Sequence, residues 1–141
     1  MAWDPTHARA QVEDLETILG ALDQNRGITD DELRTDLNRR WAVEHGMLLT
    51  ADTIFDMLNY ILDEKFGSHP KSYEDTLMRA HSHGLLDSNT YGRLRGLGNF
   101  RNMMAHPRLT ADVGRYRYNF EDALALVPRV IEQLRDWLAK Q

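Results

Sequence analysis

Cysteine is absent from this chain of 141 residues, which excludes disulfide bonds and every metal site built on thiolates. No apolar run approaches the roughly 20 residues that a membrane-spanning helix needs, and we expect no membrane partner. The first residues, from Met1 to Pro5, lack the basic start and apolar centre of a secretory signal peptide. These absences predict a cytoplasmic protein.

Several enzyme classes are excluded because their motifs are missing. There is no Walker loop, no dinucleotide fingerprint and no motif for a serine or cysteine nucleophile. The acids Asp52, Asp56 and Glu64 do not form the Glu-x-x-His pattern of di-iron bundles. His81 and His83 are two residues apart, so on a helix they diverge and cannot readily share one ion. We therefore expect neither a metal nor a cofactor.

The pattern of apolar residues predicts a single all-α domain over residues 1–141. A chain of this length can bury about two-thirds of the surface that it exposes when unfolded, so it needs no cross-link to hold a core. Apolar residues repeat at helical spacing, and no segment alternates long enough for a strand. We expect an antiparallel bundle of four long helices plus a short one, with these approximate bounds: 5–25, 29–66, 72–83, 88–106 and 120–140.

Local signals fix the expected helix ends. Thr29 and Glu32 have capping-box spacing, and one long helix is expected to run from there to Phe66. A loop is expected up to Tyr118, and Pro128 is expected to kink the last helix. Seven large apolar residues are expected to supply much of the core: Trp41, Phe55, Leu58, Leu124, Ile131, Leu134 and Trp137.

The six residues from Arg101 to His106 contain a guanidinium, an amide and an imidazole, and Pro107 follows them. Proline continues a helix poorly, so Arg101 and Asn102 should lie on a last turn that breaks at His106. Asn102 is four residues from His106 and can orient its ring. Arg101 and His106 point apart on one helix, so joint use is easiest in a twofold dimer.

Arginines gather around this histidine. Residues 88–118 contain six arginines and one acid, a formal charge of +5, whereas the rest of the chain has 11 basic and 21 acidic residues. Besides Arg101, the candidate phosphate-binding residues are Arg93, Arg95, Arg108, Arg115 and Arg117. Arginine suits phosphate through its bidentate fork. The alternative is that these arginines pair with acids on neighbouring helices, and the sequence alone leaves both readings open.

Three glycines in the same segment lower the stability of the helix expected there. Gly92, Gly96 and Gly98 each cost about 1 kcal/mol relative to alanine inside a helix. Gly92 and Gly96 are four residues apart, so together they leave a notch on one helix face. The notch fits either a tight helix–helix contact, within the bundle or across a dimer, or the close approach of an RNA backbone.

The motif resembles the signature of the HEPN superfamily, and of its HepT-like toxin branch most closely. The similarity covers roughly residues 8–139. Three stretches carry it: Arg93-Leu94-Arg95-Gly96-Leu97-Gly98-Asn99-Phe100-Arg101-Asn102-Met103-Met104-Ala105-His106, the apolar helix Trp41–Leu62, and Pro70-Lys71-Ser72-Tyr73 leading to Gly84-Leu85-Leu86. The resemblance implies a helical ribonuclease toxin with Arg101 and His106 in its site and a nucleotidyltransferase antitoxin as partner.

One position departs from that branch. HepT-like toxins usually carry a tyrosine two residues after the histidine, which the antitoxin modifies with AMP, and here that position is Arg108. Tyr116 and Tyr118 follow later and are the candidate modification sites if the partner modifies this chain.

Three functions therefore stay open. The first is a metal-independent endoribonuclease toxin that acts as a homodimer on RNA, with Arg101, His106 and Asn102 as its catalytic residues. The second is a non-catalytic HEPN domain that binds a nucleotide or a nucleotidyltransferase. The third is a helical interaction module in which the spacing of Arg101 and His106 is coincidental.

Overall fold

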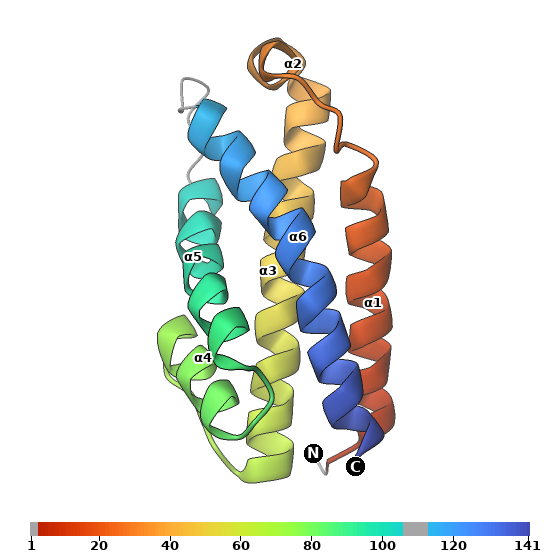
Figure 1. Ribbon diagram of the computed structural model, residues 1–141, viewed down its shortest axis with the longest axis vertical. Helices are drawn as coiled ribbons and strands as arrows, with labels where there is room; N and C mark the ends of the chain where they lie inside the picture. The colour runs from red at the N-terminus through yellow and green to blue at the C-terminus, as the bar shows by residue number, and fades with distance from the viewer. Residues whose placement is uncertain (1–2, 106–112) are drawn as a thin grey trace.

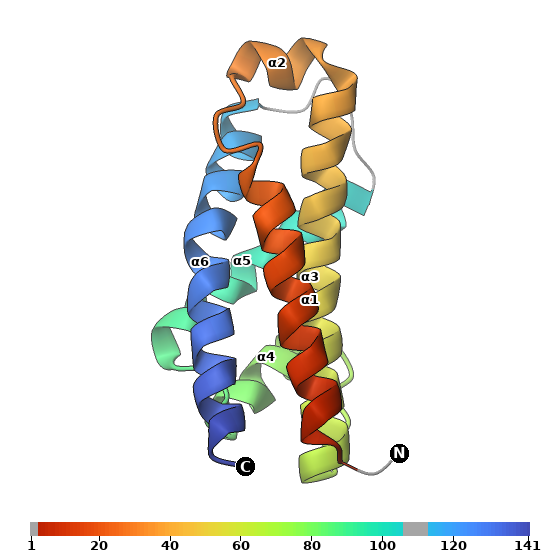
Figure 2. The ribbon, with the colours of Figure 1, turned by 90° about the vertical axis from the view of Figure 1, so that its right-hand side faces the viewer.

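The computed structural model is an all-α bundle, which confirms the expected fold class (Figures 1 and 2). It describes residues 3–105 and 113–141, with backbone only for residues 97–105. The helices are α1 (Pro5–Asp23), α2 (Asp30–Thr35), α3 (Leu37–Phe66), α4 (Tyr73–Ser82), α5 (Ser88–Ala105) and α6 (Val113–Ala139). The helices α1, α3 and α6 run along the bundle, α5 is inclined to them, α2 lies across one end, and α4 lies beside α5. Both chain termini lie at the end opposite α2.

The helix α3 is the centre of the bundle, and each of the other five helices contacts it. Its buried apolar residues recur every three or four positions: Val43, Met47, Ala51, Ile54, Phe55, Met57, Leu58, Ile61 and Leu62. Gly46 lets α1 approach closely, since an added Cβ there would lie 2.8 Å from the Leu22 side chain. α3 ends at Gly67, whose φ of 61° is the left-handed conformation of a C-cap.

The expected single helix over residues 29–66 was wrong, because the chain breaks at Asp36. The Thr29–Glu32 capping box is present, with both hydrogen bonds at 3.1 Å, but α2 ends after only six residues. Asp36 has a non-helical ψ of 89°, and its carboxylate accepts a hydrogen bond from the Arg39 N–H at 3.2 Å. A short side chain that caps the following helix competes with helix continuation, which explains the break.

The expected loop up to Tyr118 was also wrong, since α6 begins at Val113. Val113, Tyr116 and Phe120 are buried at helical spacing on the face that meets the bundle. The polar residues between them masked that stripe in the sequence. Pro128 lies inside α6 as expected, and the helix continues beyond it to Ala139.

Most of the expected core is confirmed, and its main error is Trp41. Phe55, Leu58, Leu124, Ile131 and Leu134 are buried. Trp137 is partly buried, in edge contact with Trp3, but Trp41 is 52% exposed. The buried face at that level of α3 is occupied by Arg40 and Glu44 instead, so a hydrophobic pattern could not find it.

A buried ion pair joins α2, α3 and α6. Arg40 donates from Nε to the Glu44 carboxylate at 2.9 Å and from Nη1 to the Leu33 carbonyl at 3.4 Å. The Tyr116 hydroxyl of α6 donates to the Arg40 carbonyl at 3.3 Å, and the guanidinium lies 5.3 Å from the Tyr116 ring centre. Burial, reinforced by the negative charge of Glu44, raises the pKa of the Tyr116 hydroxyl.

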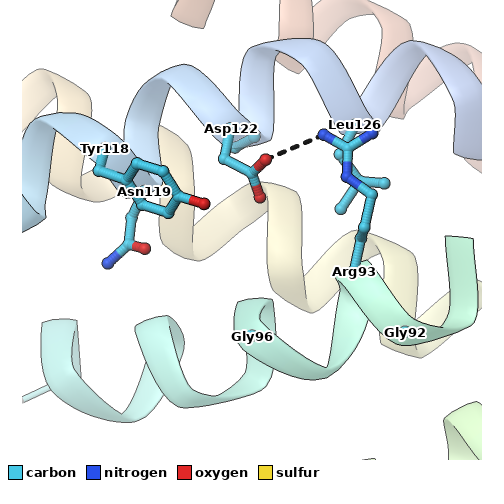
Figure 3. A pocket seen from close by; sticks show the side chains of 8 residues that line it. Gly92, Arg93, Gly96, Tyr118, Asn119, Asp122 and Leu126 are labelled. Atoms are coloured by element: carbon cyan, nitrogen blue, oxygen red, sulfur yellow. Dashed lines mark hydrogen bonds and ion pairs between the residues drawn. The ribbon is translucent and has the colours of Figure 1, made fainter. Parts of the chain in front are cut away.

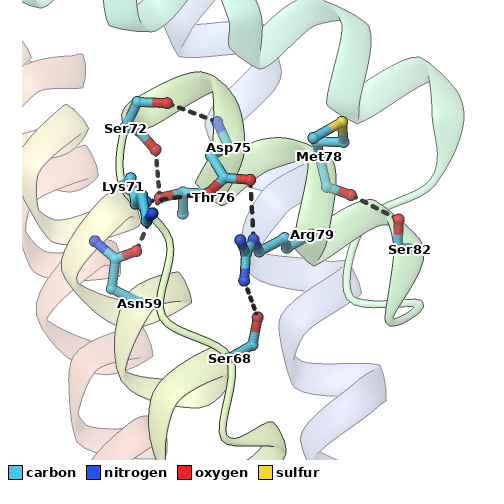
Figure 4. Close-up of polar contacts among 9 residues, drawn as sticks. All are labelled: Asn59, Ser68, Lys71, Ser72, Asp75, Thr76, Met78, Arg79 and Ser82. Carbon is cyan, nitrogen blue, oxygen red and sulfur yellow. Dashed lines mark hydrogen bonds and ion pairs between the residues drawn. The ribbon is translucent and has the colours of Figure 1, made fainter.

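A second polar cluster attaches α4 to α3 (Figure 4). The buried Thr76 hydroxyl donates to the Asn59 side chain at 2.8 Å. Ser72 caps α4, accepting from the Asp75 N–H at 3.0 Å. Arg79 bridges Asp75 and Ser68 at 2.9 and 2.8 Å, and its hydrogen bond holds the pKa of the Asp75 carboxyl below its usual range. α5 therefore follows a helix whose position is fixed.

We expect Thr76→Val to lower the free energy of unfolding by about 1–3 kcal/mol, because it leaves the Asn59 amide oxygen without its partner. Denaturant unfolding followed by circular dichroism measures the change. Thr17→Val is the matched control, since the hydroxyls of Thr17 and Thr76 both lie within hydrogen-bond distance of the carbonyl four residues earlier, but Thr17 is exposed. Equal losses in the two variants would contradict a specific role for the α3–α4 contact.

We expect Tyr116 to stay protonated in the folded protein above pH 10, where a tyrosine in an unfolded chain ionises. Because the folded pKa is raised, its contribution to stability is present below about pH 10 and is lost as pH rises from there. The difference in phenolate absorbance between wild type and Tyr116→Phe, recorded during an alkaline titration, isolates this hydroxyl. Its ionisation near pH 10 without unfolding would contradict the prediction.

Candidate functional site

The motif helix α5 is fixed to α6 at its first turn. Asp87 accepts from the Thr90 N–H at 2.8 Å, as expected of a helix cap, and that bond holds the pKa of the Asp87 carboxyl below its usual range. Gln133 of α6 donates to the Asp87 carboxylate at 3.0 Å and to the Thr90 hydroxyl at 2.7 Å. The direction of α5 toward the motif is thus set by hydrogen bonds at its base.

The motif itself is described in part. α5 is helical through Ala105, so Arg101 and Asn102 lie on a helix near its C-terminal end, as the sequence predicted. Their side-chain positions, and His106 and Arg108 altogether, lie outside the described residues. α5 runs toward the end of the bundle where α2 lies, and Arg101 and Asn102 belong to its last turns.

Two of the arginines on α5 pair with acids of neighbouring helices. Arg93 binds Asp122 of α6 at 2.9 Å, and both side chains are about two-thirds buried. Arg95 lies 3.1 Å from Glu74 of α4, with both side chains more than half exposed. An exposed ion pair contributes little to stability, so Arg95 can exchange this partner for a phosphate at little cost.

The arginines of α6 differ from each other. Arg117 binds the Ile28 carbonyl in the α1–α2 connection and the carboxylate of Asp30, the first residue of α2, and it lies 3.5 Å from Glu121 of its own helix. The hydrogen bond with Asp30 raises the pKa of this guanidinium. Arg115 is exposed on the first turn of α6. Pairing with acids therefore accounts for Arg93, Arg95 and Arg117.

A groove of about 290 Å³ lies between α5 and α6 (Figure 3). Its lining comes from three residues of α5 and five of α6: Gly92, Arg93, Gly96, Tyr118, Asn119, Asp122, Ala123 and Leu126. The ion pair between Arg93 and Asp122 crosses from one helix to the other at its Gly92 end. From Gly96, α5 continues toward Arg101.

The structure corrects one reading of the glycines. A Cβ added at Gly92 or Gly96 would meet no atom within 4 Å, so neither glycine makes a tight contact within the bundle. That role belongs to Gly46, which the sequence analysis missed. Gly98 lies among residues whose side-chain surroundings are not described.

The two candidate modification sites differ in access. Tyr116 is 2% exposed, and its hydroxyl bonds the Arg40 carbonyl. Tyr118 is 69% exposed at the edge of the groove. A bulky group could reach the Tyr118 hydroxyl without disturbing the bundle, whereas Tyr116 would first have to leave the core.

Two other histidines, His81 and His83, have structural partners. His81 Nδ1 lies 2.9 Å from the Leu86 carbonyl, and its ring stacks on Tyr91, while the His83 ring stacks on Phe66. Across residues 3–105 and 113–141, no three histidine or acidic side chains gather as they would around a metal ion. Within those ranges, no helix has the length and apolar character needed to cross a bilayer.

Solved structures share this fold at low sequence identity. The cytosolic protein of unknown function YutE from Bacillus subtilis aligns with a TM-score of 0.80 at 18% identity, covering 97% of this chain and 92% of that one. A toxin–antitoxin crystallised with AMP-PNP aligns with a TM-score of 0.78 at 14% identity, covering 91% and 95%. A toxin–antitoxin mutant named MntA-HpeT gives 0.63 at 14% identity, covering 86% and 97%.

Comparison of the sequence with protein families identifies the family, which the similarity of fold alone does not. No curated protein matched the sequence. The family described as Ribonuclease HepT-like matches residues 9–134, which span all but the two ends of the chain and include the segment from Arg101 to His106. The chain is therefore a member of the HepT-like ribonuclease family, as the resemblance had implied.

Proposed function

We propose that this protein is a metal-independent endoribonuclease toxin of a toxin–antitoxin pair, acting as a homodimer. The observation that carries the proposal is that Arg101 and Asn102 lie near the end of α5, inside the region that matches the HepT-like ribonuclease family. The proposed substrate is RNA, which supplies its own nucleophile as the 2′-hydroxyl.

The proposed chemistry needs an imidazole and a guanidinium. A histidine ordinarily titrates near neutral pH, so His106 can take the proton of the 2′-hydroxyl. The 2′-oxygen then attacks phosphorus and the bond to the 5′-oxygen breaks, which leaves a 2′,3′-cyclic phosphate. A second imidazole, His106 of the partner subunit, protonates the leaving 5′-oxygen.

Arg101 has the electrostatic role in this scheme. Its guanidinium binds the phosphate and stabilises the extra negative charge of the pentacoordinate transition state. Asn102 orients His106 from the preceding turn. Arg95, whose ion pair with Glu74 is exposed, Arg115, which is exposed on the first turn of α6, and Arg108 are the proposed phosphate contacts along the strand.

A non-catalytic role is the second candidate. The position two residues after His106 is arginine rather than the tyrosine usual in the HepT-like branch, so this chain departs from the common arrangement. In that case Arg101 and His106 would bind a nucleotide or a nucleotidyltransferase without cleaving RNA. Growth arrest when the chain is expressed alone separates the toxin from this alternative.

We expect His106→Ala and Arg101→Ala each to lower the rate of RNA cleavage by about 10²–10⁴-fold, the contribution typical of general acid–base and electrostatic groups. Asn102→Ala should be milder, because its role is orientation. Cleavage of labelled RNA in buffer containing a chelator measures the rates, and helical circular dichroism confirms folding.

Three outcomes would contradict this mechanism. Full activity of His106→Ala would remove the acid–base assignment. A stable monomer in light scattering that still cleaves RNA would remove the composite dimer site. Loss of wild-type activity in the chelator would contradict metal independence.

The proposed neutralising partner is a nucleotidyltransferase antitoxin, which either transfers AMP to the toxin or covers the positively charged segment. If AMP is transferred, we expect it at Tyr118, because the Tyr116 hydroxyl is buried and hydrogen-bonded. Intact-mass analysis and peptide mapping after co-expression with the cognate antitoxin measure this. Tyr118→Phe should abolish the added mass, and Tyr116→Phe should retain it.

Other results would change the proposed mode of neutralisation. An inhibited but unmodified toxin would show that binding alone is sufficient, which the local charge of +5 favours for an acidic partner. AMP on Tyr116, or on Tyr73 or Tyr91, would contradict the assignment based on exposure.

A further inference from the structure

We infer that the groove between α5 and α6 binds a single unpaired nucleobase of the RNA, next to the phosphate that is cut. The inference rests on the proposed function and names a subsite of that same site. Three features of the groove support it. Gly92 and Gly96 leave open space on α5, the aromatic ring of Tyr118 is exposed, and the side chains of Arg93, Asn119 and Asp122 offer hydrogen-bond donors and acceptors.

The shape of the groove suits a flat ring. Gly92 and Gly96 present no side chain, and the space above each is open to at least 4 Å from a Cβ position. The volume of about 290 Å³ is that of a small-molecule pocket rather than of a channel for a helix. Ala123 and Leu126 supply an apolar wall on α6.

The chemistry of the lining suits a base edge. The Asn119 amide offers both a donor and an acceptor, and it points from α6 toward α5 (Figure 3). Asp122 and Arg93 bind each other through one oxygen and one nitrogen at 2.9 Å, and their remaining atoms can accept and donate further hydrogen bonds. Base edges carry such donors and acceptors side by side, whereas an apolar helix of a partner would leave these groups unpaired.

Tyr118 supplies a stacking surface. At 69% it is more exposed than any other large hydrophobic residue among the described side chains, and its ring lies over the groove. Proteins recognise single-stranded RNA by stacking splayed bases on aromatic rings and by bonding their edges. The groove offers both, because the exposed ring of Tyr118 can stack on a base while the side chains of Asn119, Asp122 and Arg93 can bond its edge.

The position relative to the motif links the groove to cleavage. Five residues separate Gly96 from Arg101 on α5, a rise of about 7.5 Å along the helix axis. Five residues also rotate the helix by about 140°, but Arg101 is eight residues from Arg93 and only about 80° from it, so a base held beside Arg93 can belong to a nucleotide that adjoins the phosphate at Arg101. The groove would then determine which base lies beside the cut.

Two substitutions test the groove without touching the catalytic residues. Gly96→Leu fills it, and Tyr118→Leu removes the stacking ring. Gly20→Leu is the matched control, because Gly20 is also a helical glycine with open space around its Cβ position. All are made in full-length protein carrying His106→Ala, so that bound RNA is not cut. The probes are a labelled unstructured RNA oligonucleotide and copies of it with one abasic position.

We expect Gly96→Leu and Tyr118→Leu each to weaken RNA binding about 5- to 150-fold, the range for losing one base–aromatic stack. Gly20→Leu should bind like the parent. One abasic position should weaken binding to the parent by a similar factor and cause little further loss in the groove variants. In the cleaving background, sequencing of cut ends should show that the groove variants lose a base preference beside the cut.

The outcomes separate this inference from the proposed function. If wild type binds RNA without cutting it, and the groove variants still weaken binding, the nuclease proposal fails and the base site stands. If wild type cuts RNA but the groove variants keep its affinity and cut-site preference, the base site is overturned. A wild-type protein that binds no RNA also overturns the base site. A shift of both groove variants from dimer to monomer in light scattering overturns it too, because the groove would then be part of the contact between two copies of the chain.

Discussion

The burial of α3 on several sides is the constraint on which the bundle depends. Five helices need α3 to cover their apolar faces, and removal of apolar surface from water is the dominant favourable term in folding. A helix surrounded in this way cannot shift without unpacking its neighbours. The polar clusters around Arg40 and Thr76 then specify where α6 and α4 meet it, because an unpaired polar group there would be costly. The groove between α5 and α6 inherits its shape from that frame.

Much of this fold was predictable from the sequence because its signals are local. Helical periodicity identified the four long elements, and the spacing of Thr29 and Glu32 correctly marked the start of a helix, although that helix is the short α2. The failures came where a tertiary contact outweighs the pattern. Asp36 interrupts an otherwise continuous periodicity by capping α3. Trp41 fits an apolar stripe but is displaced from the core by the buried pair of Arg40 and Glu44.

The candidate site was predictable in its chemistry but only partly in its arrangement. Spacing and Pro107 placed Arg101 and Asn102 near a helix end, and the described backbone confirms that placement. The local charge of the segment did not reveal that Arg93 and Arg117 are held by acids brought near by folding. The groove could not be found from one helix, since it needs α6 beside α5. The only signals in the sequence were the two glycines Gly92 and Gly96 on α5 and the four-residue spacing of Tyr118 and Asp122 on α6.

The contact between α1 and α6 has a consequence for folding during synthesis on the ribosome. α1 packs on α3 and also on α6, so part of its apolar face has no final partner until α6 has emerged. Domains generally fold as units as the chain is made. The groove is built by the last two helices, so an incomplete chain lacks it. A protein of this architecture forms the groove between α5 and α6 only after α6 has been translated, and products truncated before α6 cannot form it.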